Sequence, residues 1–229
     1  SWFAPPVPDW PRPLIKGDFQ LFEAATQDGF TQDLSAFLAA GERPLVFTPG
    51  TGNVHAADFF ARALAVVDSL GRRAIFLTKE RAQVPAHLPE FVLWQPYVPL
   101  SALLPHAAVL VHHGGIGTTA EALRSGTPQL ITPFAWDQFD NGARIASLGV
   151  GMVIPAKRLQ PRKLARSLQT LATSDAIRAR CSQLAAHFIP PHDPTALCRE
   201  VERLVLARHD DAQYSNPSDL RPAAFASVR

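Results

Sequence analysis

The stretch that decides the fold is LVHHGGIGTTAEALRSGTPQLITPFAWDQFDN, residues 110–141. An apolar run ends here in two histidines, three glycines follow within four residues, and a helix-like segment opens on two threonines. Glycine allows the backbone to adopt positive φ and to approach a ligand closely. A helix N-terminus adds unpaired N–H groups and about half a positive charge. The pattern therefore predicts an anion site, with a phosphate as its natural occupant.

The residues of this turn supply the predicted phosphate contacts. Gly115 and Gly117 give the backbone its freedom, Thr118 and Thr119 open the helix, and His113 ends the strand. An imidazole N–H can donate to a phosphate oxygen. The sequence GGIG matches neither the P-loop nor the GxGxxG fingerprint. A tight glycine turn beside a helix cap, with no ligand, is the alternative that an isolated cluster leaves open.

A second glycine turn, TPGTG at residues 48–52, follows an earlier apolar run and precedes another helical pattern. It offers the hydroxyl of Thr51 beside a second helix N-terminus. Two such turns on neighbouring strands would enclose a diphosphate from two sides. Together the two turns favour a nucleotide ligand over two plain turns.

Two carboxylates near these turns have competing interpretations. Glu121 completes a capping box with Thr118, in which the carboxylate would bond the start of the helix. Alternatively, Glu121 accepts hydrogen bonds from the ribose hydroxyls of a nucleotide. Asp137 and Gln138, on the loop after the next apolar run, combine acceptors and donors suited to sugar hydroxyls. The alternative there is that Asp137 or Asp140 caps a helix beginning near residue 141.

Short apolar runs alternate with helical patterns from about residue 34 onward. This alternation predicts a doubly wound α/β fold, with a parallel sheet of about six strands covered on both faces. Ligands bind such folds beyond the carboxyl ends of the strands. The expected strands are 44–50, 73–77, 90–94, 107–111, 129–132 and 151–154. The expected helices are 56–70, 118–126, 141–149, 162–173, 175–188 and 195–208, with one helical turn at 100–106.

The two ends of the chain differ in composition from its middle. Five prolines within residues 1–13 exclude a helix or a central strand, so residues 1–20 are interpreted as a linker or wrapping arm. Residues 21–208 form the predicted domain. The polar tail 209–229 is expected to be disordered or docked on a missing partner.

The overall composition excludes several classes of protein. Of 229 residues, 47% are hydrophobic and 18% charged, as in a soluble globular protein. The net charge is +2 and the sequence contains no long run of basic residues, so no nucleic-acid partner is expected. No apolar run approaches the roughly 18 residues that a transmembrane helix needs. Cys181 and Cys198 are too few for a disulfide framework or a zinc site, so we expect the cytoplasm.

The segment WQPYVPLSALLPHAAVLVHHGGIGTTAEALRSGTPQLITPFAWDQFDN, residues 94–141, resembles the donor-binding signature of family 1 glycosyltransferases. This is the UDP-glycosyltransferase superfamily, which has the GT-B fold. The likeness is strongest to bacterial members that glycosylate lipids, sterols and secondary metabolites. It rests on the order of an aromatic-x-P, LLPH, HHGG-x-GT, Glu, G-x-P and DQ. The TPGTG turn and the proline-rich arm fit as well, so the resemblance covers most of the chain.

The resemblance implies a role for each matching position. The donor's base would stack on Tyr97, with Trp94 as a nearby alternative, and backbone groups near Val98 would read the base edge. Glu121 would bind the ribose, and Asp137 and Gln138 would hold the transferred sugar. The diphosphate would contact His113, Gly115, Gly117, Thr118, Thr119 and Thr51.

The family's catalytic base and acceptor site belong to an N-terminal domain for which this sequence has no counterpart. No catalytic residue is therefore expected in this chain, and the fragment is expected to be inactive alone. The resemblance implies an inverting enzyme without metal or cofactor. Its donor would be a UDP- or dTDP-sugar, and a glucosyl or rhamnosyl group would pass to a lipid or small-molecule hydroxyl.

The sequence leaves two alternative functions and one further partner open. The chain could be half of a nucleotide-sugar 2-epimerase, which shares the two-domain fold and uses water in place of an acceptor. It could also be a non-catalytic nucleotide-binding module. Peripheral contact with a membrane is the third open point, because the acceptor of a relative can be a lipid.

Overall fold

A computed structural model describes residues 2–10, 14, 17, 19, 21, 29–50, 56–189 and 194–212. The chain divides into two compact units, residues 1–190 and 191–229, and each is described by itself. The predicted boundaries at residues 20 and 208 stay predictions.

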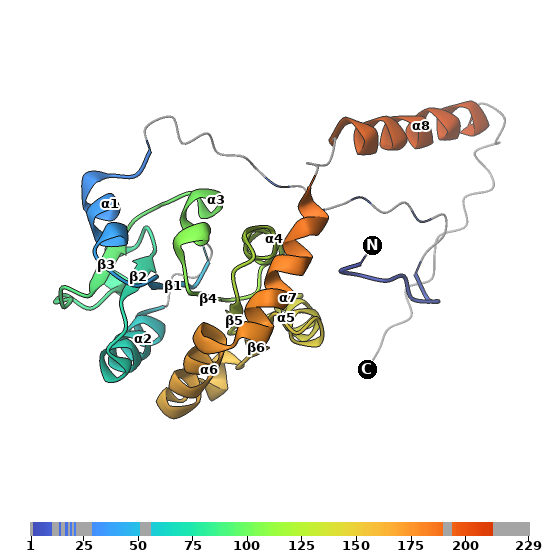
Figure 1. The fold of residues 1–229 in the computed structure, drawn as a ribbon. Helices are drawn as coiled ribbons and strands as arrows, with labels where there is room; N and C mark the ends of the chain where they lie inside the picture. The colour runs from blue at the N-terminus through green and yellow to red at the C-terminus, as the bar shows by residue number, and fades with distance from the viewer. Residues whose placement is uncertain are drawn as a thin grey trace. The chain divides into compact units, whose positions relative to one another are not determined.

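The first unit is built on a six-stranded sheet in which every neighbouring pair of strands is parallel (Figure 1). The strand order is β3-β2-β1-β4-β5-β6. The strands are β1 (Leu45–Thr48), β2 (Ala74–Leu77), β3 (Val92–Gln95), β4 (Val109–His112), β5 (Gln129–Ile131) and β6 (Gly151–Val153). The predicted doubly wound architecture is therefore confirmed.

Helices cover both faces of this sheet (Figure 1). Side chains alternate along each strand, so Phe47 and Val46 of β1 point into different layers. Phe47 packs with Phe60 and Leu168, which come from the helices on one face. Val46 packs on the other face, in a cluster that includes Leu103. The helices of this unit are α1 (Gln32–Ala39), α2 (Ala57–Leu70), α3 (Leu100–Leu103), α4 (Ile116–Ser125), α5 (Gln138–Ser147), α6 (Pro161–Thr173) and α7 (Asp175–Ala185), with short 3₁₀ turns at Arg81–Gln83, Leu104–His106, Ala156–Arg158 and Ala186–Phe188.

Two helices begin earlier than the sequence pattern predicted. Helix α4 starts at Ile116, after an N-cap at Gly115, so Thr118 lies inside the helix. The predicted capping box between Thr118 and Glu121 is therefore wrong. Helix α5 starts at Gln138, which places Gln138 in the first helical turn and not on a loop. In both cases the predicted start is too late, because the glycine or aromatic residues at the true start have weak helix propensity.

Helix α1 was not predicted at all. Its N-cap is Thr31, whose hydroxyl accepts a hydrogen bond from the amide of Leu34 at 3.3 Å. Leu34 is also the one residue of this helix that is fully buried. A single buried position gives too little periodicity for a helix to be recognised in the sequence.

The start of the proline-rich arm lies against the C-terminal part of the first unit. The ring of Trp2 stacks on His187, with centroids 4.9 Å apart. Phe3 is buried beside Phe188, and its carbonyl oxygen accepts a hydrogen bond from Arg144 at 3.2 Å. Residues 11–13 of the arm lie outside the described part of the chain.

The second unit contains helix α8 (Pro194–Ala212). The predicted helix 195–208 is confirmed and is longer than expected at its end. Most of the predicted tail, residues 213–229, lies outside the described residues. Within the described chain, no helix has the length and apolar character that crossing a membrane requires.

Two glycines allow α5 to lie close to the sheet. A Cβ on Gly151 of β6 would meet the carbonyl oxygen of Gln129 and would lie 2.6 Å from Cγ2 of Ile145. A Cβ on Gly142 of α5 would lie 3.2 Å from a methyl of Val153. Since α5 begins at the polar pair 137–138, this packing also sets the position of those two residues.

We predict that Gly151→Ala lowers the free energy of unfolding by about 2–3 kcal/mol, because the added methyl overpacks the contact between β6 and α5 against both a backbone carbonyl and Ile145. The matched control is Gly71→Ala, since Gly71 ends α2 in the left-handed region with open space around its Cα. That substitution adds only backbone strain of about 1 kcal/mol. Urea unfolding measures both variants, and equal stability losses would contradict the packing argument.

Candidate functional site

The strands that lead into the two glycine turns lie side by side where the winding of the sheet reverses. From β1 the chain moves outward to β2 and β3, whereas β4, β5 and β6 lie on the other side of β1. Strands β1 and β4 pair in parallel with Thr48 opposite His112, so the turns after them leave the sheet at the same level. Such a topological switch point is where doubly wound folds bind ligands. Thr51 lies outside the described residues, so its predicted phosphate contact stays a prediction.

The imidazole of His113 lies between these turns. A Cβ on Gly50 would lie 2.6 Å from Nδ1 of His113, and a Cβ on Gly115 would lie 3.0 Å from its Cε1. Only glycine leaves room for the ring on both sides. Gly50 also has φ +90°, which disfavours any other residue there. The sequence showed the glycines, and the structure shows that they accommodate this histidine.

His113 is suited to a ligand that accepts a hydrogen bond. Its Nδ1 is buried and has no hydrogen-bond partner among the described residues. Burial lowers the pKa of His113, and the nearby carboxylate of Asp137 partly opposes this shift. The ring is therefore neutral at neutral pH and carries one N–H donor.

The neighbouring His112 has a structural role. It is fully buried, and its Nδ1 accepts a hydrogen bond from the amide of Gly114 at 3.1 Å. Its Nε2 lies 3.0 Å from Oε1 of Gln129 on β5 and must donate to it, because that oxygen can only accept. Burial lowers the pKa of His112 to about 3. A neutral His112 thus holds the first residue of the glycine turn.

The N-terminus of α4 faces the same place. The amide of Thr119 donates to the carbonyl of Gly115 at 3.0 Å, so the amides before it, from Gly115 to Thr118, precede the helix's own hydrogen-bond ladder. No side chain among the described residues caps this end. The hydroxyl of Thr119 donates back to Gly115 and the residue is buried, so its predicted phosphate contact has no open hydroxyl.

A pocket of about 360 Å³ opens beside this helix end. It brings together six of the predicted site residues, namely Tyr97, Val98, His113, Gly115, Gly117 and Thr118. Tyr97 is exposed, and the ammonium of Lys79 lies 5.9 Å from its ring centroid. Trp94 does not line this pocket, but its indole N–H donates at 2.9 Å to the carbonyl of Thr78, which does. Sequence reasoning missed the segment Thr78–Glu80, which forms the wall nearest Tyr97 and has no motif of its own.

Glu121 lies one turn further along α4 than Thr118. Its carboxylate accepts a hydrogen bond from Arg124 at 2.8 Å, in a pair that is mostly buried. This ion pair replaces the capping interaction that the sequence suggested. Glu121 does not line the pocket directly.

Asp137 and Gln138 begin helix α5. The side-chain oxygen of Gln138 accepts hydrogen bonds from the amides of Phe134 and Ala135, at 3.0 and 3.2 Å. The side-chain oxygen of Gln138 therefore stabilises the loop that precedes α5. Asp137 occupies the N-cap position and makes no capping bond, so the alternative that Asp137 caps the helix is wrong. Its carboxylate bonds Asn141 at 2.9 Å.

The loop before Asp137 also presents aromatic side chains that the sequence analysis did not single out. Trp136 is 88% exposed and has φ +50°, which is rare for a bulky residue. The ring centroid of Phe134 lies 6.2 Å from that of His113. No sequence signal identifies a tryptophan with positive φ.

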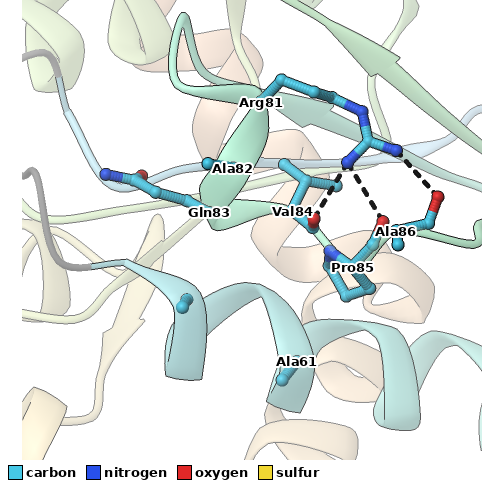
Figure 2. Close-up of a pocket in the computed structure, with 8 residues that line it drawn as sticks. Ala61, Arg81, Ala82, Gln83, Val84, Pro85 and Ala86 are labelled. Carbon is cyan, nitrogen blue, oxygen red and sulfur yellow. Dashed lines mark hydrogen bonds between the residues drawn. The ribbon is translucent and has the colours of Figure 1, made fainter.

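A second hollow, of about 590 Å³, shares no lining residue with this pocket and lies between α2 and the turn after β2 (Figure 2). Figure 2 shows Arg81 donating to the carbonyl oxygens of Val84, Pro85 and Ala86, at 2.9, 3.1 and 3.0 Å. These hydrogen bonds from the guanidinium of Arg81 therefore stabilise the loop at residues 84–86. Over the part of the chain that the structure describes, no three His, Cys, Asp or Glu side chains gather to hold a metal ion.

The chain is a doubly wound domain with a pocket at its switch point. Comparison with known proteins identifies its family. Residues 61–204 match the family model "Erythromycin biosynthesis protein CIII-like, C-terminal domain". Because the match covers more than half of the chain, the chain belongs to this family. The resemblance to family 1 glycosyltransferases seen in the sequence is thereby confirmed.

Two curated relatives and one solved structure illustrate the likeness. The aklavinone 7-beta-L-rhodosaminyltransferase of Streptomyces galilaeus is 32% identical over 64% of this chain and 33% of its own length. The O-mycaminosyltylonolide 6-deoxyallosyltransferase of Streptomyces fradiae is 32% identical over 77% of this chain and 41% of its own length. The glycosyltransferase VinC, solved in complex with dTDP, is 31% identical with a TM-score of 0.58, over 73% of this chain and 43% of that one. The chain thus spans less than half of each.

We predict that His112 makes the stability of the domain depend on pH. The unfolded chain binds this proton near the ordinary pKa of 6.5, whereas the pKa of the folded ring is about 3. Between these values the unfolded state binds more protons, so the free energy of unfolding falls as the pH falls. This contribution is fully present above about 6.5 and is lost progressively toward about 3.

The variant His112→Asn keeps an acceptor for the amide of Gly114 and removes the titration. Its stability deficit relative to wild type should shrink by about 2 kcal/mol between about pH 7.5 and pH 5, because only the wild type pays for the buried neutral ring. Urea unfolding at both pH values tests this. A deficit that stays constant with pH would show that His112 does not titrate in this range.

Proposed function

We propose that this chain is the nucleotide-sugar-binding domain of an inverting glycosyltransferase. The observation that carries the proposal is the meeting of two glycine turns around His113, directly beside the uncapped N-terminus of α4. Neutral N–H donors and a helix dipole that converge at one point suit a diphosphate. Membership of a family whose relatives are named as glycosyltransferases supports the sugar donor as the ligand.

The donor would extend from the pocket at Tyr97 to the start of α5. In this arrangement the base stacks on Tyr97 and the phosphates face His113 and the amides from Gly115 to Thr118. Glu121 accepts from the ribose through the carboxylate oxygen that Arg124 leaves free, since a carboxylate has about four lone-pair positions. Asp137 and the amide nitrogen of Gln138 hold the sugar.

We propose a pyrimidine nucleoside diphosphate sugar as the donor. A ribose-reading Glu121 supports UDP, whereas the relative solved with dTDP supports the deoxynucleotide. For the sugar, we propose a glucosyl or rhamnosyl group, because the DQ signature indicates a hexosyl donor. The acceptor, a lipid or small-molecule hydroxyl, would bind the remainder of the enzyme. A cytoplasmic setting agrees with the free thiols of Cys181 and Cys198.

The chemistry assigned to this domain is stabilisation of the leaving group. A base elsewhere in the enzyme deprotonates the acceptor hydroxyl, which attacks the anomeric carbon and breaks its bond to the diphosphate. The charge that develops on the diphosphate is met by fixed N–H donors, which need no rearrangement at that moment. His113 would contribute one of these donors.

Calorimetric titration of this chain with UDP, dTDP, GDP and uridine tests the proposal. We expect both pyrimidine diphosphates to bind, and uridine to bind much more weakly because it lacks the phosphates. The variant His113→Ala should weaken diphosphate binding by about 1.5–3 kcal/mol, the value of a hydrogen bond to a charged group. The control His106→Ala changes an exposed histidine outside the pocket and should bind as wild type does.

Unchanged diphosphate affinity in a folded His113→Ala variant would remove His113 from the site. The same chain, incubated with UDP-glucose and dTDP-rhamnose and a panel of hydroxyl acceptors, should yield no glycosylated product by mass spectrometry. Turnover by this chain alone would contradict the assignment of the base to another part of the enzyme.

A separate prediction concerns Glu121. Glu121→Gln keeps a side-chain oxygen for Arg124, so the variant should fold, but its melting temperature should fall because a mostly buried guanidinium loses its counter-charge. Affinity for UDP should fall more than affinity for dTDP, because only the ribose of UDP offers a 2′-hydroxyl to the carboxylate. Equal losses for the two nucleotides would show that Glu121 does not read the 2′-hydroxyl.

A further inference from the structure

One side chain joins the glycine turn proposed to hold the diphosphate to the carboxylate proposed to hold the sugar. Asn141 lies in the first turns of α5 and is almost fully buried. Its amide nitrogen donates to the carbonyl oxygen of Gly114 and to Oδ2 of Asp137, both at 2.9 Å. A side-chain amide has only two N–H groups, so both are used. Because both partners can only accept, the orientation of the amide group is fixed as well.

The contact at Gly114 holds a peptide that has little freedom of its own. The N–H of Gly114 donates to His112 and its carbonyl accepts from Asn141, so the residue is held from opposite sides. Its φ is +96°, and a Cβ there would lie 2.7 Å from a methyl of Ile131. The turn that carries His113 and Gly115 therefore has a fixed position relative to α5.

Asp137 does not cap its helix, because its own backbone is helical, with φ −63° and ψ −15°, and its side chain is free for another contact. An aspartate at an N-cap position ordinarily bonds the amides of the first turn. Here the carboxylate bonds Asn141 instead, through Oδ2 alone. Asp137 is exposed, so without this bond its side chain would exchange among rotamers. With the bond, Oδ1 keeps a defined direction and remains available to a ligand.

We propose that Asn141 is a positioning residue that fixes the sugar-binding carboxylate of Asp137 relative to the turn that holds the diphosphate. The two groups are then held at one fixed spacing, which only a ligand that carries both a diphosphate and a sugar can use in full. Asn141 thereby favours a nucleoside diphosphate that carries its sugar over the bare nucleoside diphosphate. This inference rests on the proposed function and concerns the same site.

The variants Asn141→Ala and Asn141→Asp test the inference by calorimetry with UDP, UDP-glucose, dTDP and dTDP-glucose. The alanine removes both hydrogen bonds. The aspartate also places a second carboxylate beside Asp137 and beside a carbonyl oxygen, so its effect should be larger. The matched control is Asp140→Ala, which removes an exposed partner of Arg144 from the same helical turn and does not contact Gly114.

We expect the preference for the sugar-bearing ligand, measured as the ratio of the two dissociation constants, to fall roughly fivefold or more in Asn141→Ala. Affinity for the bare diphosphate should fall by a smaller factor, because His112 still holds the turn. The Asp140→Ala control should keep the wild-type ratio. Thermal unfolding of each variant is measured in parallel, because a merely structural role would lower the melting temperature and leave the ratio unchanged.

The possible failures are distinguishable. An unchanged ratio in a folded Asn141→Ala variant would overturn the positioning role alone. The positioning role would also be overturned if the wild-type chain bound UDP-glucose no more tightly than UDP, and dTDP-glucose no more tightly than dTDP. The wild type would then have no preference for the sugar-bearing ligand. If the wild-type chain binds none of the four compounds, the proposed function itself fails, and this inference fails with it.

Discussion

The parallel pairing of β1 with β4 is the constraint on which the rest of the site depends. Residues 48 and 112 are more than sixty positions apart in the sequence, yet the register of these two strands places them opposite each other. Gly50 and Gly115, which follow these strands, then lie on two sides of the ring of His113. Helix α4 begins immediately beyond, so its free amides face the same point. A strand order without this reversal would separate the two turns.

Hydrogen bonding and burial give the two adjacent histidines different roles. His112 is enclosed and uses both ring nitrogens within the protein, so it fixes the turn. His113 is partly open, and its Nδ1 finds no partner within the described chain. Burial keeps both rings neutral at neutral pH. A neutral donor suits the proposed binding and later release of a diphosphate, because it would hold the anion less strongly than a charged ring would.

Much of the fold could be predicted, because short apolar runs indicate buried strands and a glycine after a helical pattern indicates the end of the helix. The six strands, and the end of α2 at Gly71, follow from such signals. The starts of α4 and α5 were misplaced because Gly115 and the aromatic loop give no local sign of a helix. The glycine turns and His113 could be found from sequence, whereas the links made by Asn141 and Arg124 could not. Those links depend on which side chains the folded backbone brings within hydrogen-bond distance.

The central claim is that the N-terminus of α4 and the glycine turn beside it bind the diphosphate of a nucleotide. The most direct measurement is the change in backbone amide NMR shifts when dTDP or UDP is added to the isotope-labelled chain, with thymidine and uridine as controls. The account predicts that the diphosphates shift the amides of residues 113–118 most strongly, and that the nucleosides shift those near Tyr97 only. Diphosphate-dependent shifts confined to another surface, or equal effects of nucleoside and diphosphate on residues 113–118, would contradict it.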